Sequence, residues 1–440
     1  MLTDGVVRSF NPIGQGSFVT EHFYQDGIEQ ASVVFDAGFL KTATKGGERR
    51  ARRLIQSTLT KGVPISAIFV SHLDEDHVGL VPYILSEYRD QVKNVVLPRF
   101  SQETVFTYLF WYTVQGMAPI KGKKRWSSDL AQLITEVARK LRYVSGEEDV
   151  LLDQRRGPNW HLIRPHLGER PPPFQEEIAD AIDLGQEGSD RAADRPSGGV
   201  FHLVGRSCRW YFVPYHREVK DDKRKAKQFW KWIIKNFRKC FQRGSYHPDE
   251  PFFSGDPDAL VKLRWLSECV LRQESKYNQL AKIYNATWGD RNRDSMVVTS
   301  FPSRDCDIDP YLISPIGSVS FCVNAYLYEY GSAPFMPAFK PGAIYTGDSN
   351  AAELPLEILM GSPYVSYNIG SVQVPHHGSA NSWDKQLVSA NAILYFASYG
   401  SANIYGHPAP KVIRDITYGL KIPLFYNEYS LPYLQVFPYS

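Results

Sequence analysis

The sequence predicts an α/β protein in which strands and helices form layers at both ends of the chain. Three strand-like runs occupy residues 5–40, with a turn at 14–16. Helical spacing at 49–62 then precedes an apolar strand at 65–72 and a second helix at 78–88. Strand character returns later, at 295–301, 318–330, 342–348, 365–377 and 392–400. Alternation of this kind favours a β-sheet core that is covered by helices.

The middle of the chain has a different character. Loop-rich composition at 145–200 is followed by a strand pair at 200–215, and residues 217–287 have mainly helical spacing. We therefore predict one domain that is built from two halves, residues 1–95 and 288–440. Residues 96–287 are predicted to form a long, partly helical insertion between them.

Composition limits the classes of protein that remain. The chain has 440 residues, and no apolar run approaches the roughly 18–20 residues that span a bilayer, so we expect no membrane segment. The first residues lack the layout of a signal peptide. Five scattered cysteines without a C-x-x-C pair are typical of reduced thiols, so we expect a cytoplasmic protein. A net charge of +3 does not by itself demand a nucleic-acid partner.

Metal-ligand chemistry is concentrated at the end of the strand at 65–72. There the sequence IFVSHLDEDHVGLVP contains His72, Asp74, Asp76 and His77. In an extended segment alternate residues point the same way, so His72, Asp74 and Asp76 are expected to converge. Imidazole and carboxylate ligands suit borderline or hard divalent cations. The alternative is an acidic, solvated helix start with an aspartate as its N-cap.

Three later strands end in the same kind of residue. Asp348 follows GAIYTG, although an aspartate after a glycine also fits an ordinary turn. The pair His376 and His377 ends SVQVPHH, and burial of such a pair is costly unless it is ligated or hydrogen-bonded. His407 follows a fourth strand. The recurrence at four strand ends favours one shared site.

Taken together, the segments IGQGS, VVFDAG, SHLDEDHVG, YTGD, VPHHGS and NIYGHP resemble the metallo-β-lactamase superfamily, in the family's order. The likeness is greatest to the soluble ComEC-like metallohydrolase domain of competence proteins. That branch shares H-x-D-x-D-H in place of H-x-H-x-D-H. Its N-x-x-S segment resembles NRDSMVVTS, Asn292 to Ser300, here. The resemblance implies a four-layer αββα sandwich, and it covers the two flanking halves of the chain.

The resemblance also implies a dinuclear metal centre with two divalent ions, Zn or Mn. Asp348 would bridge the ions, and the exchange of a histidine for an aspartate makes Mn²⁺ more plausible relative to Zn²⁺. Catalytic roles fall to Asp76, His377 and His407. The implied metal ligands are His72, Asp74, Asp76, His77, Asp348, His376 and His407. His377 is expected either to ligate or to hydrogen-bond a phosphate oxygen.

A basic segment within the insertion, residues 217–239, is the second feature. Aromatic and aliphatic residues repeat there at helical spacing, and a basic stripe takes another face: Lys223, Lys227, Lys231, Lys235 and Arg238. Such a stripe is able to follow a phosphate backbone. An amphipathic helix packed by its apolar edge, or a helix on a membrane surface, would show the same pattern.

These observations favour a metal-dependent hydrolase, a phosphodiesterase or nuclease that acts on nucleic acid. Two adjacent cations suit phosphodiesters because they stabilise both the attacking and the leaving oxygen. A hydrolase of a small molecule (a cyclic nucleotide, phosphonate or thioester) is the second hypothesis, because one fold supports many reactions. A regulatory module whose insertion binds a protein partner is the third.

Overall fold

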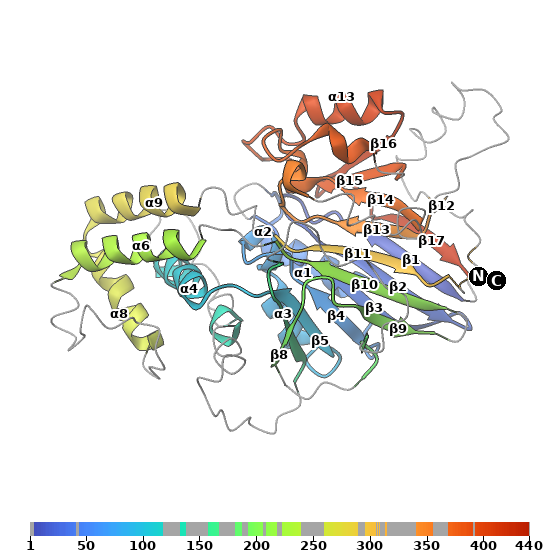
Figure 1. Ribbon diagram of the computed structural model, residues 1–440, viewed down its shortest axis with the longest axis horizontal. Helices are drawn as coiled ribbons and strands as arrows, with labels where there is room; N and C mark the ends of the chain where they lie inside the picture. Colours follow the sequence, from blue (N-terminus) through green and yellow to red (C-terminus); the bar gives the residue numbers. More distant parts are fainter. Residues whose placement is uncertain are drawn as a thin grey trace.

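A computed structural model gives the fold of the protein (Figure 1). It describes residues 4–40, 44–117, 133–137, 157–166, 181–186, 192–205, 208–217, 222–238, 259–288, 295–304, 306, 308, 313–314, 340–354, 368–389 and 392–439. The predicted strand at 318–330, Asn292 and the side chain of Lys223 lie outside the described part.

The first sheet has nine strands in the order β12-β17-β1-β2-β3-β4-β5-β6-β8. Strands β3, β4, β5, β6 and β8 run parallel, whereas β12, β17, β1, β2 and β3 pair antiparallel. The bounds are β1 (Gly5–Phe10), β2 (Val19–Gln25), β3 (Ile28–Phe35), β4 (Ile65–Phe69), β5 (Asn94–Pro98), β6 (Asn159–Ile163), β8 (Ala192–Arg195), β12 (Ile313–Ser314) and β17 (Tyr433–Pro438).

The second sheet has eight strands in the order β16-β15-β14-β13-β11-β10-β9-β7. Its strands β13, β14, β15 and β16 are parallel neighbours. The bounds are β7 (Ile182–Asp183), β9 (Phe201–Val204), β10 (Arg209–Tyr215), β11 (Val297–Pro302), β13 (Gly342–Tyr345), β14 (Ile369–Gln373), β15 (Leu394–Ser398) and β16 (Ile422–Tyr426).

Helices cover both outer faces of the paired sheets, which confirms the predicted α/β sandwich. An apolar core with members from both sheets, such as Phe69 and Phe212, lies between them. A second core joins the first sheet to α1 (Gly47–Thr58) and α3 (Val81–Glu87). A third core joins the second sheet to α13 (Pro410–Tyr418). The remaining short helices are α2 (Glu75–Val78), η2 (Ala351–Glu353), η3 (Pro375–Gly378) and η4 (Lys385–Ser389).

Four further helices pack on one another and extend from the end of the sandwich where α2 lies (Figure 1). They are α4 (Gln102–Met117), α6 (Asp222–Asn236), α8 (Ala259–Leu271) and α9 (Glu274–Trp288). Aromatic rings hold them together: Trp111 stacks on Tyr284 with ring centroids 4.1 Å apart. Trp230 also donates a hydrogen bond to Thr107 at 2.9 Å. Among the described helices, none is long and apolar enough to cross a membrane.

Part of the range 96–287 also contributes to the sandwich. Strands β6 and β8 extend the first sheet, and β7, β9 and β10 extend the second. The helical group formed by α4, α6, α8 and α9 projects from one end of the sandwich in Figure 1, and its apolar residues belong to the same core as those of the first sheet. The division of the chain at residues 95 and 288 stays a prediction.

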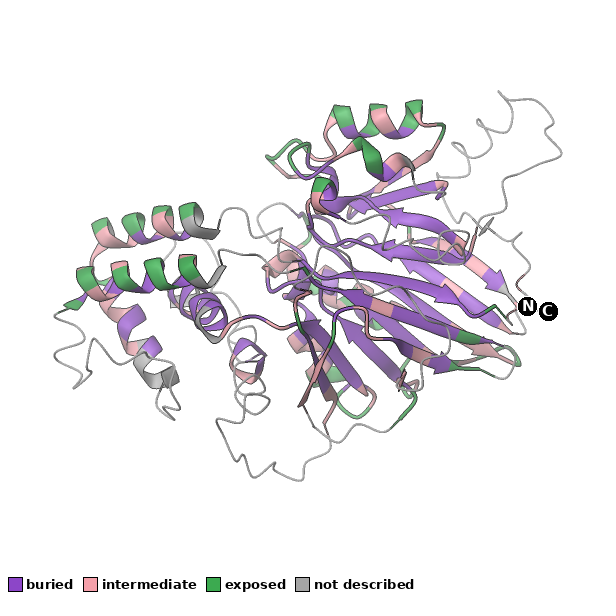
Figure 2. Ribbon diagram, in the orientation of Figure 1, coloured by how far each residue is buried: buried purple, intermediate pink, exposed green. Residues whose placement is uncertain are grey.

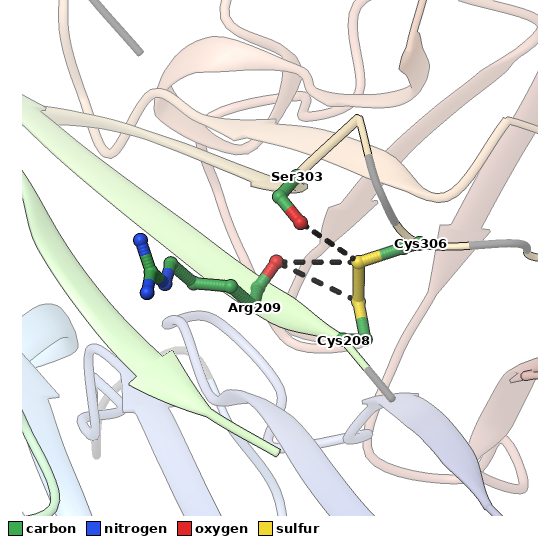
Figure 3. The surroundings of a disulfide bond; sticks show 4 residues. All are labelled: Cys208, Arg209, Ser303 and Cys306. Atoms are coloured by element: carbon green, nitrogen blue, oxygen red, sulfur yellow. Dashed lines mark hydrogen bonds between the residues drawn. A yellow bond between two sulfur atoms is a disulfide. The ribbon is translucent and has the colours of Figure 1, made fainter. Parts of the chain in front are cut away.

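The expectation of five reduced cysteines is wrong, because Cys208 and Cys306 form a disulfide (Figure 3). Antiparallel pairing of β10 with β11 brings the two segments together, and the Ser303 hydroxyl donates to Cys306 Sγ at 3.2 Å. The cysteines are 98 residues apart in the sequence, so their spacing gave no sign of the pair. Cysteine usage therefore no longer supports the expected cytoplasmic location.

Candidate metal centre

The predicted ligands meet at one edge of the sandwich, where parallel strands end. Strand β4 leads into His72 and Asp74, and β13 leads into Asp348. Strand β14 leads into His376 and His377 on η3, and β15 into the loop that contains His407. Parallel strands place their carboxyl ends at the same edge, so residues far apart in the sequence converge there.

The segment after β4 turns into a helix earlier than expected. Helix α2 begins at Glu75, so Asp76 lies on a helical turn and not in an extended segment. Asp74 occupies the N-cap position, yet its side chain makes no capping hydrogen bond. The convergence of His72, Asp74 and Asp76 therefore comes from this turn. The alternative of an aspartate as N-cap explains the position of Asp74 but not the direction of its carboxylate.

Unusual backbone conformations position the ligands of the second half. Gly347 has a φ of 55°, and a Cβ there would lie 2.6 Å from the Cβ of Ser71, so only glycine allows this approach. His376 and His377 both have left-handed φ angles, 49° and 54°. Such a residue costs on the order of 1–3 kcal/mol and persists only where its surroundings hold it.

Hydrogen bonds fix the rings of this histidine pair. The Nδ1 of His377 donates to the backbone oxygen of Ser398 at 3.0 Å, which leaves its Nε2 without a proton in the neutral ring. The Nδ1 of His376 lies 3.1 Å from Ser382 Oγ. Both Nε2 atoms consequently face Asp348.

Asp348 lies at the centre of the cluster and divides it into two sides. Its Oδ1 is 2.9 Å from His77 Nε2 and 3.8 Å from His377 Nε2. Its Oδ2 is 3.9 Å from His72 Nε2 and 3.7 Å from His376 Nε2. Each carboxylate oxygen thus faces a different pair of imidazole nitrogens.

Two overlapping groups of donor atoms are close enough to share a cation. In each group all ligand atoms lie within 4.8 Å of one another. The first group is Asp76, His77, Asp348 and His377, and the second is His72, Asp74 and Asp76. Asp76 belongs to both groups, and Asp348 also reaches His72 of the second. Two carboxylates, those of Asp76 and Asp348, are therefore shared between the two groups of ligands. This arrangement suits a pair of cations.

A further layer of residues holds the histidines in place, and Asp36 is its centre. Asp36 follows β3 and has a φ of 53°. Its Oδ2 lies 2.8 Å from His77 Nδ1 and accepts from Ser71 Oγ at 2.9 Å, and its Oδ1 accepts from the Ser71 amide at 2.7 Å. A carboxylate on the second ring nitrogen is the usual way in which proteins orient a ligating histidine.

Asp36 is absent from the predicted site residues, although it belongs to the VVFDAG segment. The available signal was that Asp36 follows β3 as His72 follows the adjacent parallel strand β4. His72 has two serine neighbours: its Nδ1 lies 3.0 Å from Ser71 Oγ and 3.2 Å from Ser295 Oγ. Ser295 is the serine of the N-x-x-S pattern that begins at Asn292.

Helix α4 of the helical group also reaches the site. The hydroxyl of Tyr112 donates to the backbone oxygen of Leu73 at 2.9 Å and lies 3.4 Å from Asp74 Oδ1. The helical group is therefore joined to the segment that carries the first ligands.

The electrostatics of the cluster favour ionised carboxylates. Burial raises the pKa of both Asp76 and Asp348, but neighbouring histidines outweigh it. The pKa of Asp76 falls to about 2 beside His377 and His77, and the pKa of Asp348 falls well below its usual value. Burial opposes protonation of His77, yet Asp348 and Asp36 raise its pKa well above the ordinary value. Burial and the nearby His77 lower the pKa of His72.

Unsatisfied buried atoms show that these residues fit divalent cations. Ten buried side-chain nitrogen or oxygen atoms in the described part of the chain make no hydrogen bond, and five belong to this cluster. They are the Nε2 atoms of His72, His77 and His377, the Oδ1 of Asp348 and the Nδ1 of His407; of these, His77 Nε2 and Asp348 Oδ1 face each other as an ion pair 2.9 Å apart, and the other three lack even such a contact within 3.3 Å. Buried polar atoms without partners are costly, and ligation to a cation removes that cost.

His407 lies beside the two groups and is not a member of either. Its ring is 5.3 Å from that of His376. Burial, together with His376 and His377, lowers the pKa of His407 to about 4, so the ring is neutral at neutral pH. The predicted nucleic-acid residues lie elsewhere, on and just after α6 of the helical group.

Comparison with known proteins agrees with this geometry in part. A model of the metallo-beta-lactamase superfamily matches residues 24–213, from β2 to β10. That range contains the ligands that follow β4, whereas those that follow β13, β14 and β15 lie beyond it. No curated protein matches the sequence.

Among solved structures, human tRNase Z, short form, is similar at 15% sequence identity with a TM-score of 0.22. The similarity covers 48% of this chain and 60% of that chain, so this chain spans less than two thirds of its length. A likeness with this TM-score carries no argument about activity.

Proposed function

We propose that this protein is a member of the metallo-beta-lactamase superfamily and that it is a metal-dependent phosphodiesterase that cleaves nucleic acid. The observation that carries the proposal is the position of Asp348, whose Oδ2 faces His72 Nε2 and whose Oδ1 faces His377 Nε2, two buried nitrogens that make no hydrogen bond. Two bound cations would supply Lewis-acid stabilisation to the non-bridging and leaving oxygens of a phosphodiester. The H-x-D-x-D-H segment supports placement in the ComEC-like branch.

The ligand residues fall into two sets, one for each cation. His72, Asp74 and His376 would hold one cation, and His77 and His377 the other, with Asp76 and Asp348 between them. Three carboxylates offset most of the charge of two divalent ions. Mixed imidazole and carboxylate ligands are compatible with Zn²⁺ and Mn²⁺, and the share of carboxylate favours Mn²⁺. His407, which belongs to neither group of ligands, presents its ring beside His376, where an oxygen of the phosphate would lie.

Helix α6 supplies a surface for the polynucleotide. Its apolar side is buried against the helical group through Phe229, Ile233 and Phe237. Its basic side chains Lys227, Lys231 and Lys235, and Arg238 just after the helix, are exposed. Residues 223–239 contain no aspartate or glutamate. Figure 2 shows exposed residues along both α6 and its neighbour α9. The helix is therefore amphipathic and packs by its apolar edge. Its exposed face is positively charged, and phosphate groups are attracted to such a face.

Purified protein loaded with Mn²⁺ or Zn²⁺ provides the test of activity, with labelled single-stranded DNA, duplex DNA and RNA as substrates. We expect hydrolysis of at least one polynucleotide by the wild type and none by Asp348→Asn. Hydrolysis of simple phosphodiesters without hydrolysis of any polynucleotide would favour the small-molecule hydrolase instead.

A charge-removal variant tests the surface of α6. Replacing Lys227, Lys231 and Lys235 with glutamine should weaken binding to all sequences alike. The log–log salt slope should become shallower by about 0.7–0.9 for each lost phosphate contact. The matched control removes three exposed cations from other faces: Arg53→Gln, Lys385→Gln and Lys411→Gln. Equal effects of the two triple variants would exclude α6 as a specific binding surface.

A further inference from the structure

Exposed apolar side chains gather on the loops that follow β15 and β16, the first of which carries His407. In the described part of the chain, nine large apolar side chains are exposed, and four of them lie in two loops that follow β15 and β16. They are Ile404 (90% exposed), Tyr405 (56%), Tyr429 (67%) and Leu431 (60%). Single exposed apolar residues need no explanation, but a concentration of them at one edge indicates a binding surface.

Hydrogen bonds tie these two loops to each other. The carboxylate of Glu428 accepts from the Ser401 amide at 2.9 Å and from the Ser401 hydroxyl at 2.6 Å. The Asn427 side chain also donates to the hydroxyl of Tyr399 at 3.3 Å. The two loops thus form one surface.

The loop that carries Tyr405 is closed on itself by Asn403. Its side-chain amide donates to the backbone oxygens of Gly400 and His407, at 2.6 and 3.2 Å. Its side-chain oxygen accepts from the His407 amide at 3.2 Å. Because these bonds span Tyr405, its exposed ring is held by an ordered backbone before any ligand arrives.

A series of rings leads from the buried carboxylate to this surface. His376 Nε2 is 3.7 Å from Asp348 Oδ2, and the His376 ring is 5.3 Å from that of His407. The His407 ring is in turn 5.8 Å from the ring of Tyr405, with an angle of 33° between the planes. A substrate group that leaves the metal centre past His407 therefore meets Tyr405 next.

We propose that Tyr405, with Ile404 beside it, is a stacking platform for an unpaired nucleobase next to the scissile phosphate. The platform makes single-stranded nucleic acid the substrate class, and this inference rests on the proposed function. Aromatic rings stack on every base, so they support a strand without selecting its sequence. A base that is paired within a duplex already stacks on its neighbours and does not offer its face.

The test uses two single-stranded oligonucleotides with the same phosphate backbone. One is oligothymidylate, and the other has an abasic tetrahydrofuran unit at every position. We expect the metal-loaded wild type to have a lower KM for oligothymidylate than for the abasic strand. Tyr405→Ala should reduce this preference by about fivefold to a hundredfold, the range that the loss of stacking on one base produces. Tyr405→Phe, which keeps the ring, should retain it.

Tyr418→Ala provides the matched control, because Tyr418 is 80% exposed and lies at the end of α13, outside the two loops. It should leave the preference unaltered. The platform would be overturned if Tyr405→Ala kept the wild-type preference for oligothymidylate, or if it raised the KM equally for both strands. The first of these results would suit a protein-binding surface. A wild type that cleaves neither strand, and no other polynucleotide, would instead refute the proposed function.

Discussion

Two buried clusters of charged residues in the described part of the chain differ in how completely their polar atoms are satisfied. Between the sheets, the three guanidinium nitrogens of Arg8 all have partners, among them Glu21, Tyr345 and Gln435, and only the Gln435 side-chain nitrogen in this cluster makes no hydrogen bond. Both carboxylate oxygens of Glu21 accept hydrogen bonds as well. Around Asp348, by contrast, the Nε2 atoms of His72 and His377 and the Nδ1 of His407 are buried without hydrogen bonds.

The difference separates a structural role from a functional one. A fully bonded ion pair such as that of Arg8 and Glu21 connects strands β1 and β2 and needs nothing else. A buried cluster whose nitrogens make no hydrogen bonds is costly unless another group, such as a cation, binds to those nitrogens. The first cluster should therefore control folding, and the second should control the binding of metal.

The largest expected effect is that of Asp348→Asn on activity. The change removes the negative charge that both groups of histidines share, so hydrolysis should fall to background. The circular dichroism spectrum should stay that of the wild type, because Asp348 lies at a strand end. Hydrolysis by this variant within tenfold of the wild type would show that Asp348 is not central to the site.

Glu21→Ala should have the opposite profile. It leaves the buried Arg8 without its carboxylate, and removal of one partner from a buried pair costs about 3–5 kcal/mol of unfolding free energy. Urea denaturation measures this loss, while the metal content per folded chain should be unaltered. The double variant Arg8→Met, Glu21→Leu should recover part of the stability, since no isolated charge remains. Loss of metal in folded Glu21→Ala would mean that the two clusters are coupled.

Acid should destabilise the protein through His216, a buried histidine outside both clusters. Burial lowers its pKa to about 4 in the folded state, compared with an ordinary value of about 6.5. The unfolded state therefore binds more protons below pH 6.5. The stability is fully present above that pH and is lost as pH falls from about 6.5 to about 4.

The loss of unfolding free energy should reach about 3 kcal/mol, because each pH unit between the folded and unfolded pKa values corresponds to about 1.4 kcal/mol. His216→Asn can still donate to Ile163 but does not titrate, so its urea midpoint should fall less steeply on acidification. Parallel midpoint curves for the two proteins would exclude His216 as a source of acid sensitivity.

The smallest expected effect is that of Asp36→Asn, which changes a residue that supports a ligand. Asp36 orients His77, and loss of such a partner typically lowers metal affinity by about 10–100-fold. Competition with a chromophoric chelator measures this affinity. Glu29→Gln is a suitable control, because Glu29 contacts His22, a histidine outside the site. An affinity equal to that of the wild type would show that Ser71 alone is sufficient to hold the histidines.

The strand ends were predictable because each motif is local: His72, Asp348, His376 and His407 each follow an apolar run. Contacts between segments were not. The role of Asp36 depends on β3 lying beside β4, and the disulfide depends on β10 pairing with β11. The alternating pattern also extended the strand too far, since β4 ends at Phe69 and α2 begins at Glu75. The amphipathic character of α6, which is a local periodicity, was predicted correctly.

The number of cations that each chain binds tests the central claim most directly. Metal-free protein dialysed against Mn²⁺ should bind two ions per chain, and the bound pair should give the electron paramagnetic resonance spectrum of two coupled ions. His72→Gln should lose the ion on the Oδ2 side of Asp348, together with the coupled spectrum. A wild-type chain that binds one ion or none under conditions in which it hydrolyses phosphodiesters would contradict a dinuclear centre around Asp348.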